Sequence, residues 1–436
     1  MTLPAPEKFV SEVDSLQDLA LLREYAEDRT QFIVSDAPWL EALRETGKES
    51  FEHMGFPMPS MERWKYTNLR QLKDQEFKYQ AIAEVAGIIT DSYTIVLDNG
   101  YPSSLPIDLP EGVYIQKLSV AIKEKEELCQ KYLVNVGNFE EYPFLALNSA
   151  YINEGLVIHI AEGVNLERPI KIINNGYSAD SMTCPRILLV LEAGAKATIS
   201  ENWQGDGRYF SSEVVDIVLK PESSLFHYRI DNHGEDSNIF STQIITQEKN
   251  SVYDSFSLIS GLGRLCRDVS ARLIDASVSC SIKGGYLLKG CQHFDVSINT
   301  EHFEPECCSE QLFKGVLNAK SRAVFQGKIH VHRGAQGTHG SQLNNALLLS
   351  EEAEVSAKPE LEIYNDDVVC SHGATVGQLD ETALFYLQSR GIPKEEARCL
   401  LMSSFMAQLL ETIKNEEIRD EMSAYVAERL KDINNG

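Results

Sequence analysis

The sequence predicts a mainly β protein, in which a β-solenoid lies between an N-terminal and a C-terminal helical region. One observation is a change along the chain: residues 1–145 read as helical or mixed, residues 146–377 as short strands, and residues 378–436 as helices. The second observation is a faint repeat in the strand-rich part, where a small or polar turn residue precedes an alternating strand. The repeats start at Ala195, Ser224, Ser251, Ser277, Ser321 and Ala353.

The spacing of this repeat favours a solenoid over other β architectures. Successive starts are 29, 27, 26, 44 and 32 residues apart, and repeats of about 20–50 residues are typical of solenoids and propellers. In a solenoid each turn buries its inner face only by stacking on its neighbours. A β-sandwich with unequal loops is the alternative, and the irregular step of 44 residues keeps it open.

The N-terminal region is predicted to begin with helices. Apolar residues recur at near-helical spacing in a charged background, at Leu16, Leu19, Leu21, Leu22, Phe32, Trp39, Leu40 and Leu43. Pro57 and Pro59 then lie within three residues, which no helix interior tolerates, so we expect a break before the segment 62–67. Residues 76–145 have a mixed pattern that indicates no single element.

The middle region shows the alternation expected of strands that are buried on one face. Val278, Cys280 and Ile282 are separated by Ser279 and Ser281. Successive side chains of a strand point to opposite faces, so this pattern places the apolar residues on one side and the serines on the other.

The ends of such a solenoid carry unpaired strand edges, which must be covered or will pair with another chain. The helical regions on both sides of residues 146–377 fit that covering role. If the C-terminal cover is incomplete, the last strand becomes a place where two subunits can join.

The C-terminal region is predicted to form three helices. Asp380 can cap the first, which includes Leu384, Tyr386 and Leu387, and Gly391 suits its end. Pro393 fits the first turn of the second helix, whose packed face we expect to consist of Ala397, Leu400, Leu401, Ser404 and Phe405. The last helix has an apolar face at Ile418, Met422, Tyr425 and Leu430. These helices either pack on the body alone or also dock a partner protein.

The composition excludes several classes of function. The chain has 436 residues and a net charge of −25, which disfavours nucleic acids and anionic membranes as partners. No run approaches the ~20 apolar residues of a membrane span, and the N-terminus lacks the pattern of a signal peptide. The nine scattered cysteines are then expected to be reduced thiols, and the expected location is the cytoplasm.

Several catalytic motifs are absent from the sequence. It has no Gly-x4-Gly-Lys-Ser/Thr loop, no Cys-x-x-Cys pair and no Gly-x-Ser-x-Gly turn. Hydrolysis of ATP through a phosphate-binding loop is therefore not expected of this chain, and no enzymatic activity is predicted.

The strongest candidate for metal chemistry is the pair Cys370 and His372. Residues i and i+2 of a strand share a face, about 7 Å apart along the chain, so a thiol and an imidazole form half of an iron or zinc site. Two ligands are too few for a closed metal site, and the other ligands would come from elsewhere in this chain or from a second chain. His330 and His332 have the same spacing and could be ligands or plain surface residues. Cys307 and Cys308 are adjacent in the chain, so their side chains are expected to point to opposite faces of a strand and cannot readily share one ion.

The segment that contains this pair carries a family resemblance. Residues 358–380 (KPELEIYNDDVVCSHGATVGQLD) resemble the signature of the SufB/SufD family, and residues 345–350 (NALLLS) and 384–392 (LFYLQSRGI) continue it. Residues 62–67 (ERWKYT) resemble the N-terminal motif of the same family. The sequence Gly-Ala-Thr-Val-Gly after His372 looks more like SufD-type members, because SufB-type members tend to carry an acidic Glu-His-Glu stretch there.

The resemblance implies a right-handed parallel β-helix and a subunit of the SUF scaffold for iron–sulfur cluster assembly. Members of the SufD type pair with SufB through the C-terminal ends of their β-helices, and they dock the ATPase SufC through C-terminal helices. His372 and Cys370 match residues at the SufB interface, where the nascent cluster is thought to form transiently. No stable cofactor is expected on the isolated chain. When the chain is expressed alone, it is expected to form a homodimer.

The residues expected to contact partners follow from the same resemblance. Ile363 and Val369 lie beside the pair on the predicted open edge and are assigned to the SufB-like partner. The C-terminal helices supply the surface for the SufC-like ATPase, at Leu384, Phe385, Tyr386, Arg390 and Phe405. The alternatives are a β-helix carbohydrate-active enzyme of the extracellular type, a self-contained homodimeric iron-binding protein, and the SufB-type paralogue.

Overall fold

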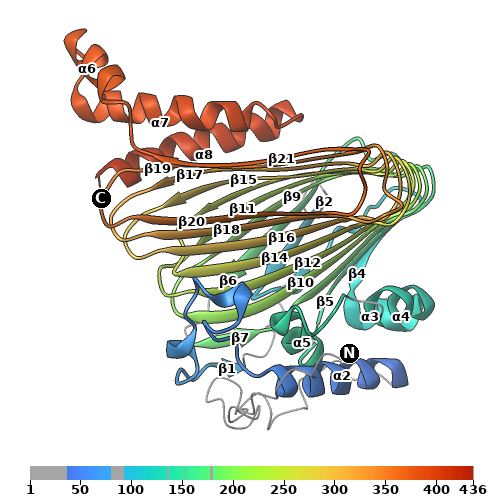
Figure 1. The fold of residues 1–436 in the computed structure, drawn as a ribbon. Coiled ribbons are helices and arrows are strands. Elements are labelled where there is room, and N and C mark those ends of the chain that lie inside the picture. The colour runs from blue at the N-terminus through green and yellow to red at the C-terminus, as the bar shows by residue number, and fades with distance from the viewer. Residues whose placement is uncertain (1–36, 80–92, 135–136, 153, 177–179, 436) are drawn as a thin grey trace, which may run out of the picture.

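The computed structural model describes residues 37–79, 93–134, 137–152, 154–176 and 180–435. Its centre is a parallel β-solenoid whose strands form two long sheets, with helices at both ends of the chain (Figure 1). The predicted β-solenoid between helical regions is therefore confirmed, and the sandwich alternative is wrong, because each strand pairs in parallel with the next strand but one. The helix expected from Leu16 to Phe32 lies outside the described residues.

Sheet A consists of parallel strands that come from alternate steps along the chain. They are β5 (Gly155–Ile160), β8 (Arg186–Leu191), β10 (Tyr209–Leu219), β12 (Asn238–Gln247), β14 (Arg264–Leu273), β16 (His293–His302), β18 (Arg322–Val331) and β20 (Glu354–Ile363). At its first end, β4 (Val113–Lys117) pairs antiparallel with β5. Two short strands, β1 (Lys78–Tyr79) and β7 (Ser181–Thr183), join beside β10.

Sheet B faces sheet A and takes the strands in between. They are β2 (Tyr93–Asp98), β6 (Ile170–Gly176), β9 (Lys196–Gly205), β11 (Ser224–His233), β13 (Val252–Ser260), β15 (Ser279–Leu288), β17 (Cys308–Leu317), β19 (Thr338–Leu348) and β21 (Val368–Gly377). At its first end, β3 (Tyr101–Ser104) pairs antiparallel with β2. A strand of the N-terminal region, β2, thus belongs to the same sheet as the strands of the middle region.

The irregular step in the sequence repeat has a simple structural cause. The repeats that start at residues 195, 224, 251 and 277 precede strands of sheet B, whereas those at 321 and 353 precede strands of sheet A. Counted on sheet B alone, strands begin at residues 196, 224, 252, 279, 308, 338 and 368, so successive steps are 27–30 residues. The period is regular, and the step of 44 residues marks a change from one sheet to the other.

The space between the two sheets holds the largest apolar cluster of the described chain. It is built by the inward residues of every turn, from Ile95 and Leu156 to Phe325 and Ala353. The expected alternation is confirmed at the start of β15, where Cys280 and Ile282 are buried and Ser279 is exposed. Each turn of the solenoid contributes an apolar inner face, and the stacking of successive turns provides the core that no single turn could form alone.

Helices at the C-terminus cover part of the outer face of sheet B. They are α6 (Glu381–Ser389), α7 (Lys394–Leu410) and α8 (Glu416–Asn435). The last two pack on β13, β15 and β17, whereas α6 extends away from the solenoid (Figure 1). The predicted cap is confirmed, because the Asp380 side chain accepts hydrogen bonds from the backbone N–H groups of Thr382 and Ala383. Gly391 adopts a positive φ of 87° after this helix, as its predicted role at the helix end requires.

The predicted packing face of α7 was only partly right. Ala397 is buried, but Leu400 is exposed, and the buried side chains in the second half of the helix are Met402, Met406, Leu409 and Leu410. The reason is a contact with β15: a Cβ atom added to Gly285 would lie 2.8 Å from the Met406 Cε atom. The missing side chain at Gly285 lets the methionine face approach the sheet. For α8 the predicted apolar face is confirmed at Ile418, Met422 and Leu430.

Elements of the N-terminal region cover the outer face of sheet A. They are α2 (Pro38–Met54), the short 3₁₀ turns η2 (Glu62–Trp64) and η3 (Arg70–Leu72), α3 (Leu118–Glu124), α4 (Glu126–Val134) and α5 (Pro143–Ala150). The buried ring of Trp64 packs edge-on against Phe144, with 5.5 Å between ring centroids. The segment 62–67 therefore packs on the N-terminal elements through Trp64. Among the described residues, no helix is both long and apolar enough to cross a membrane.

The two ends of the solenoid are finished differently. At the first end, the antiparallel strands β3 and β4 continue the sheets. At the second end, β20 is hydrogen-bonded only to β18, and β21 only to β19, within the part of the chain that the structure describes. We call β20 and β21 the open edge.

Candidate functional site

Cys370 lies on the outermost strand of sheet B, within the open edge. Its register partner on β19 is Gly340, where an added Cβ atom would be 3.3 Å from the Cys370 Sγ atom. The half-buried thiol packs with Ile329 and Val331 at the end of the solenoid interior. Burial raises the pKa of Cys370. The thiol is therefore protonated in the isolated chain, and metal binding would have to displace that proton.

His372 follows two residues later on the same strand and is exposed. Its register partner is Gln342, which is buried. Because strand side chains alternate, Cys370 and His372 share one face of β21. The structure thus places both residues on β21, the outermost strand of sheet B, and none of the described helices buries His372.

These two residues do not complete a metal site within one chain. Among the described residues, no third histidine, cysteine or carboxylate donor lies close enough to form a group with them. The sequence had predicted such a half-site, with the remaining ligands supplied from elsewhere. The ligand role of Cys370 and His372 stays a prediction.

Apolar side chains are exposed along the open edge, close to the candidate ligands. Val369 is 63% exposed and Ile363 40% exposed. Tyr364 and Val376 are exposed as well. Large apolar residues on an unpaired strand are typical of a surface that another chain covers.

The residues predicted to dock an ATPase differ in their accessibility. On α6, Phe385 is 72% exposed, and Tyr386 and Arg390 are also exposed, with an Arg390 Nη2 to Tyr386 Oη hydrogen bond of 3.1 Å. Phe405 is half-buried beneath the Lys314 ammonium group, 4.7 Å from its ring centroid. Leu384 is only 3% exposed. Its side chain packs within the protein, so we leave it out of the candidate contact surface.

A second group of metal-binding residue types lies on the outer face of sheet A. The donor atoms of Glu301, His330 and His332 all lie within 4.8 Å of one another. Burial and the neighbouring His332 lower the pKa of His330. The sequence pattern had indicated the two histidines but not Glu301, because their proximity depends on the register between β16 and β18, one turn apart.

The other predicted pair behaves as its spacing implied. Cys307 is buried and donates its thiol to the carbonyl oxygen of Asp275, with 3.2 Å between sulfur and oxygen. Cys308 is exposed. The two adjacent cysteines therefore point to opposite sides of the strand, as expected, and do not face a common ion.

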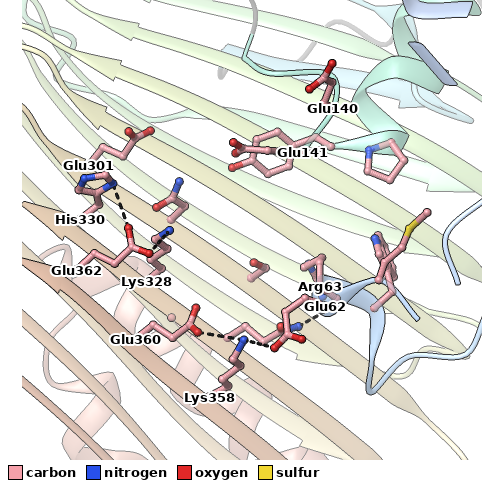
Figure 2. A pocket seen from close by; sticks show the side chains of 18 of the residues that line it. Glu62, Arg63, Glu140, Glu141, Glu301, Lys328, His330, Lys358, Glu360 and Glu362 are labelled. Atoms are coloured by element: carbon pink, nitrogen blue, oxygen red, sulfur yellow. Dashed lines mark hydrogen bonds and ion pairs between the residues drawn. The ribbon is translucent and has the colours of Figure 1, made fainter. Parts of the chain in front are cut away.

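A groove opens beside the Glu301, His330 and His332 group. It has a volume of about 810 Å³ and lies between sheet A and the N-terminal segment (Figure 2). Its lining is rich in carboxylates, including Glu62, Glu140, Glu141, Glu301, Glu360 and Glu362. The basic residues in the same lining are Arg63, Lys328 and Lys358.

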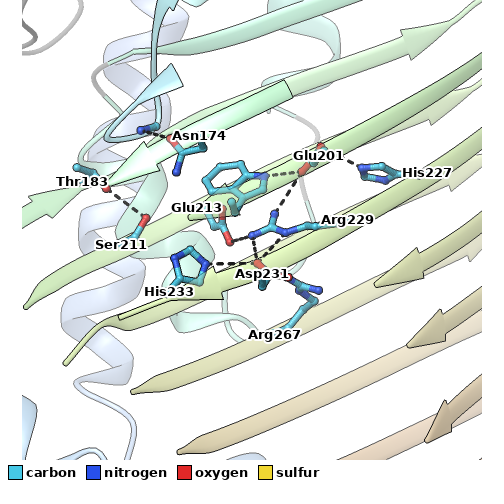
Figure 3. A network of polar contacts seen from close by, with 12 residues as sticks. Asn174, Thr183, Glu201, Ser211, Glu213, His227, Arg229, Asp231, His233 and Arg267 are labelled. Atoms are coloured by element: carbon cyan, nitrogen blue, oxygen red, sulfur yellow. Dashed lines mark hydrogen bonds and ion pairs between the residues drawn. The ribbon is translucent and has the colours of Figure 1, made fainter. Parts of the chain in front are cut away.

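The interior of the early turns contains a charged network that sequence reading had missed. Arg229 contacts Glu213 and Asp231 at 2.6 and 2.7 Å, and Arg267 contacts Asp231 at 2.7 Å (Figure 3). Although burial opposes ionisation, Arg229 and Arg267 hold the pKa of Asp231 well below its usual value. The network is fully buried, and its charges neutralise one another inside the core.

A signal for this network was present in the sequence. On β11 the inward positions alternate with outward ones, and they are His227, Arg229, Asp231 and His233. A strand whose inward face carries polar, titratable side chains at four successive positions indicates a paired polar layer, because unpaired charges are rarely buried.

Two family models match this chain. The family model of the SufBD core domain of SUF iron–sulfur cluster assembly matches residues 172–405, and that of the SufBD N-terminal region matches residues 17–172.

Relatives with assigned names cover most of the chain. The iron–sulfur cluster assembly protein SufD of Escherichia coli is 29% identical over 390 residues, covering 86% of this chain and 90% of its own length. Protein ABCI7 of Arabidopsis thaliana, a chloroplastic protein, is 29% identical over 427 residues, covering 93% and 89%. SufD of Bacillus subtilis is 24% identical over 441 residues, covering 90% and 94%.

The family models together span the N-terminal elements and the solenoid as far as α7, and two of the relatives described above are named SufD. The resemblance first read from residues 358–380 is thus confirmed. This chain belongs to the SufBD family of SUF iron–sulfur cluster assembly proteins and is SufD-like.

Proposed function

We propose that this chain is a non-catalytic scaffold subunit whose open edge pairs with a SufB-like subunit during iron–sulfur cluster assembly. The observation that carries the proposal is the coincidence of three features at one place. Among the described residues, the edge strands lack a partner on one side, large apolar side chains are exposed there, and two residues of metal-ligand type occur without a third. A second chain would supply both the missing strand partner and the missing ligands.

In this proposal Cys370 and His372 hold the nascent cluster only while the two subunits are joined. The thiol loses its proton on binding iron, and the imidazole binds through a neutral nitrogen. The partner contributes the remaining ligands. The cluster is cargo rather than a resident cofactor, so the isolated chain is expected to hold none.

The energy for opening this interface must come from another protein in our proposal, because the sequence has no phosphate-binding loop. We assign docking of a SufC-like ATPase to the exposed side of α6, at Phe385, Tyr386 and Arg390, with Phe405 at its border. The helix extends away from the solenoid, which leaves that side free for a partner (Figure 1).

The same edge offers a route to self-association. A chain expressed without its partner is expected to pair with a second copy of itself, because the unpaired strands remain. All nine cysteines are free thiols in the structure, which supports a reducing compartment such as the cytoplasm as the site of action. Membership of the SufBD family gives no support to the carbohydrate-active enzyme alternative.

The test is anaerobic reconstitution after co-expression with SufB-like and SufC-like subunits. His372→Ala is expected to reduce the yield of cluster, measured by absorption and by iron and sulfide content, while the three-protein complex still elutes together. The matched control is His53→Ala, because His53 is an exposed histidine on α2, away from the open edge. An unchanged cluster yield in the His372 variant would remove the ligand role.

The pairing itself needs a separate measurement. Purified complex is expected to show cross-links between the open edge and the SufB-like chain, identified by mass spectrometry. Cross-links that involve only α2 to α4 would contradict the proposed seam.

A further inference from the structure

Three charged or metal-binding residues form a row across three neighbouring strands of sheet A. Glu301 on β16 is the register partner of His330 on β18, and His330 is the register partner of Glu362 on β20. His332 follows His330 by two residues and lies on the same face. This group is outside the pair Cys370 and His372, which belongs to sheet B.

The distances within the group suit a single ion. The His332 Nε2 atom is 3.4 Å from the Glu301 Oε2 atom, and the His330 Nδ1 atom is 3.5 Å from the Glu362 Oε2 atom. Ligand atoms at ~2.0–2.1 Å from a tetrahedral ion lie about 3.3 Å from one another. The donors are therefore close enough to share one ion after rotation of their side chains.

The imidazole rings are held in place by stacking. The His332 ring lies parallel to the His330 ring, with 4.1 Å between centroids, and also to the Phe303 ring, with 4.2 Å. The ring of Tyr364 contacts His330 at 5.4 Å. Because an imidazole nitrogen binds a metal in the plane of its ring, one of the two rings must rotate out of this stack before both can bind the same ion.

The charges around the group leave a carboxylate available. Lys328 pairs with Glu362 at 3.0 Å. Arg272 is the register partner of Glu301 on β14, but its guanidinium lies over the Phe303 ring, 5.6 Å from the centroid. Within the described residues, the structure gives Glu301 no ion pair with lysine or arginine.

The group is also reachable from solvent. His330, Glu301 and Glu362 line the groove of about 810 Å³ beside the N-terminal segment, and its carboxylates outnumber its basic side chains (Figure 2). A negatively charged groove raises the local concentration of cations.

We propose that Glu301, His330 and His332 form a binding site for a divalent transition-metal ion such as Fe²⁺ or Zn²⁺, with Glu362 as a further ligand. Two imidazoles and one carboxylate favour such ions, whereas Mg²⁺ and Ca²⁺ prefer oxygen donors alone. The site extends from β16 to Glu362 on β20, but it shares no residue with the pair Cys370 and His372 on β21, so it could hold an ion independently of the proposed cluster ligands.

The experiment measures binding of Fe²⁺, under anaerobic conditions, and of Zn²⁺ to the metal-free full-length chain. A Cys370→Ser/His372→Ala background removes the other candidate ligands, so that binding in it reports on the outer face of sheet A. We expect one ion of either metal per chain, and a tenfold excess of Mg²⁺ should not displace it. Stabilisation of the protein against thermal unfolding by Zn²⁺ provides a second readout.

Variants then assign the ligands. The double variant His330→Ala/His332→Ala should abolish the stoichiometric binding, and Glu301→Gln should weaken it by at least about tenfold, because a ligand with charge is lost. His339→Ala is the matched control, since His339 is an exposed histidine on the neighbouring sheet. Circular dichroism and the urea midpoint of the metal-free variants check that they fold.

The proposal is overturned if the background chain binds no Fe²⁺ or Zn²⁺. It is equally overturned if the folded double variant binds as the background does, or if a tenfold excess of Mg²⁺ displaces the ion. None of these three results would affect the role proposed for Cys370 and His372, because those residues are absent from the background chain.

Discussion

The outer face of sheet A is closed over β14 and β16 but open at β20, although all three strands belong to the same repeat. Over β14 and β16, Arg63 reaches two buried carboxylates, with Nε 2.7 Å from Asp268 and Nη1 2.7 Å from Asp295. On β20, Glu354 meets Arg322 in a pair whose two side chains are both about 60% exposed. The same kind of charge pair is thus buried in one place and solvated in the other.

The difference separates what stabilises the chain from what remains available to other molecules. A buried pair is costly to break, because the remaining charge is left in a poorly solvated place. An exposed pair contributes little, because water and salt screen it. The contacts over β14 and β16, which we call the covered strands, are therefore expected to determine the stability of the fold. The open edge is expected to determine association with other chains.

Substitution of Arg63, which anchors the N-terminal segment on β14 and β16, should have the largest effect on stability. Arg63→Ala leaves Asp268 and Asp295 without their guanidinium, and burial already raises the pKa of Asp268. We expect the free energy of unfolding to fall by about 3–5 kcal/mol, measured by urea denaturation. A loss below about 1 kcal/mol would mean that the segment 62–67 does not hold the fold together.

The pH dependence of stability tests the same covered region. Burial lowers the pKa of His293 to about 4, and the charged groups around it are Asp295, Arg264, Arg322 and Arg63. The unfolded chain takes up this proton near pH 6.5, but the folded chain does so only near pH 4. Stability is therefore complete above pH 6.5 and should decrease as the pH falls from 6.5 to 4, by roughly 2–3 kcal/mol for this group.

The measurement is the urea midpoint at a series of pH values for the unsubstituted chain and for His293→Gln. The glutamine variant cannot take up the proton, so its stability should decrease less between pH 6.5 and pH 4 than that of the unsubstituted chain. Parallel curves for the two proteins would show that His293 does not contribute. Thr67, whose hydroxyl lies 3.0 Å from the His293 Nε2 atom, can still contact a glutamine side chain.

Charges placed on the open edge should affect association and leave folding intact. In Ile363→Lys/Val369→Lys both lysines replace exposed apolar side chains, and lysine on an edge strand disfavours pairing. We expect at least about a tenfold weaker affinity for the SufB-like subunit, measured by titration, and an unchanged urea midpoint. The matched control is Ile107→Lys, since Ile107 is 78% exposed in the loop after β3 at the first end of the solenoid.

The smallest effect is expected for the exposed pair on β18 and β20. Arg322→Ala breaks the contact with Glu354 but leaves no buried charge behind. The free energy of unfolding should change by less than about 1 kcal/mol. A loss as large as that of Arg63→Ala would contradict the distinction between the covered strands and the open edge.

Much of the fold could be predicted because its signals are local. The cap at Asp380, the alternation at Cys280 and Ile282, and the helices after residue 378 depend on neighbouring residues. The change from one sheet to the other at residue 321 could not be predicted, because inward and outward positions alternate in the same way on both sheets.

The candidate sites show the same limit. Cys370 and His372 are neighbours on one strand, so their spacing was enough to place them together. Glu301 meets His330 only through the register of β16 and β18, which a single sequence does not reveal. Leu384 was expected on a contact surface, but the tertiary packing of α6 buries it.

The position of residues 62–67 also constrains the order of events on the ribosome. Glu62 contacts Lys358 on β20, and the two residues are 296 positions apart in the chain. At a synthesis rate of ~5–20 residues per second, roughly 15–60 s separate their appearance. The segment can therefore dock on β14 and β16 through Arg63 as soon as Asp268 and Asp295 are available. Its contact with β20 must wait until nearly the whole polypeptide has emerged, and that contact completes the attachment of the segment in the newborn protein.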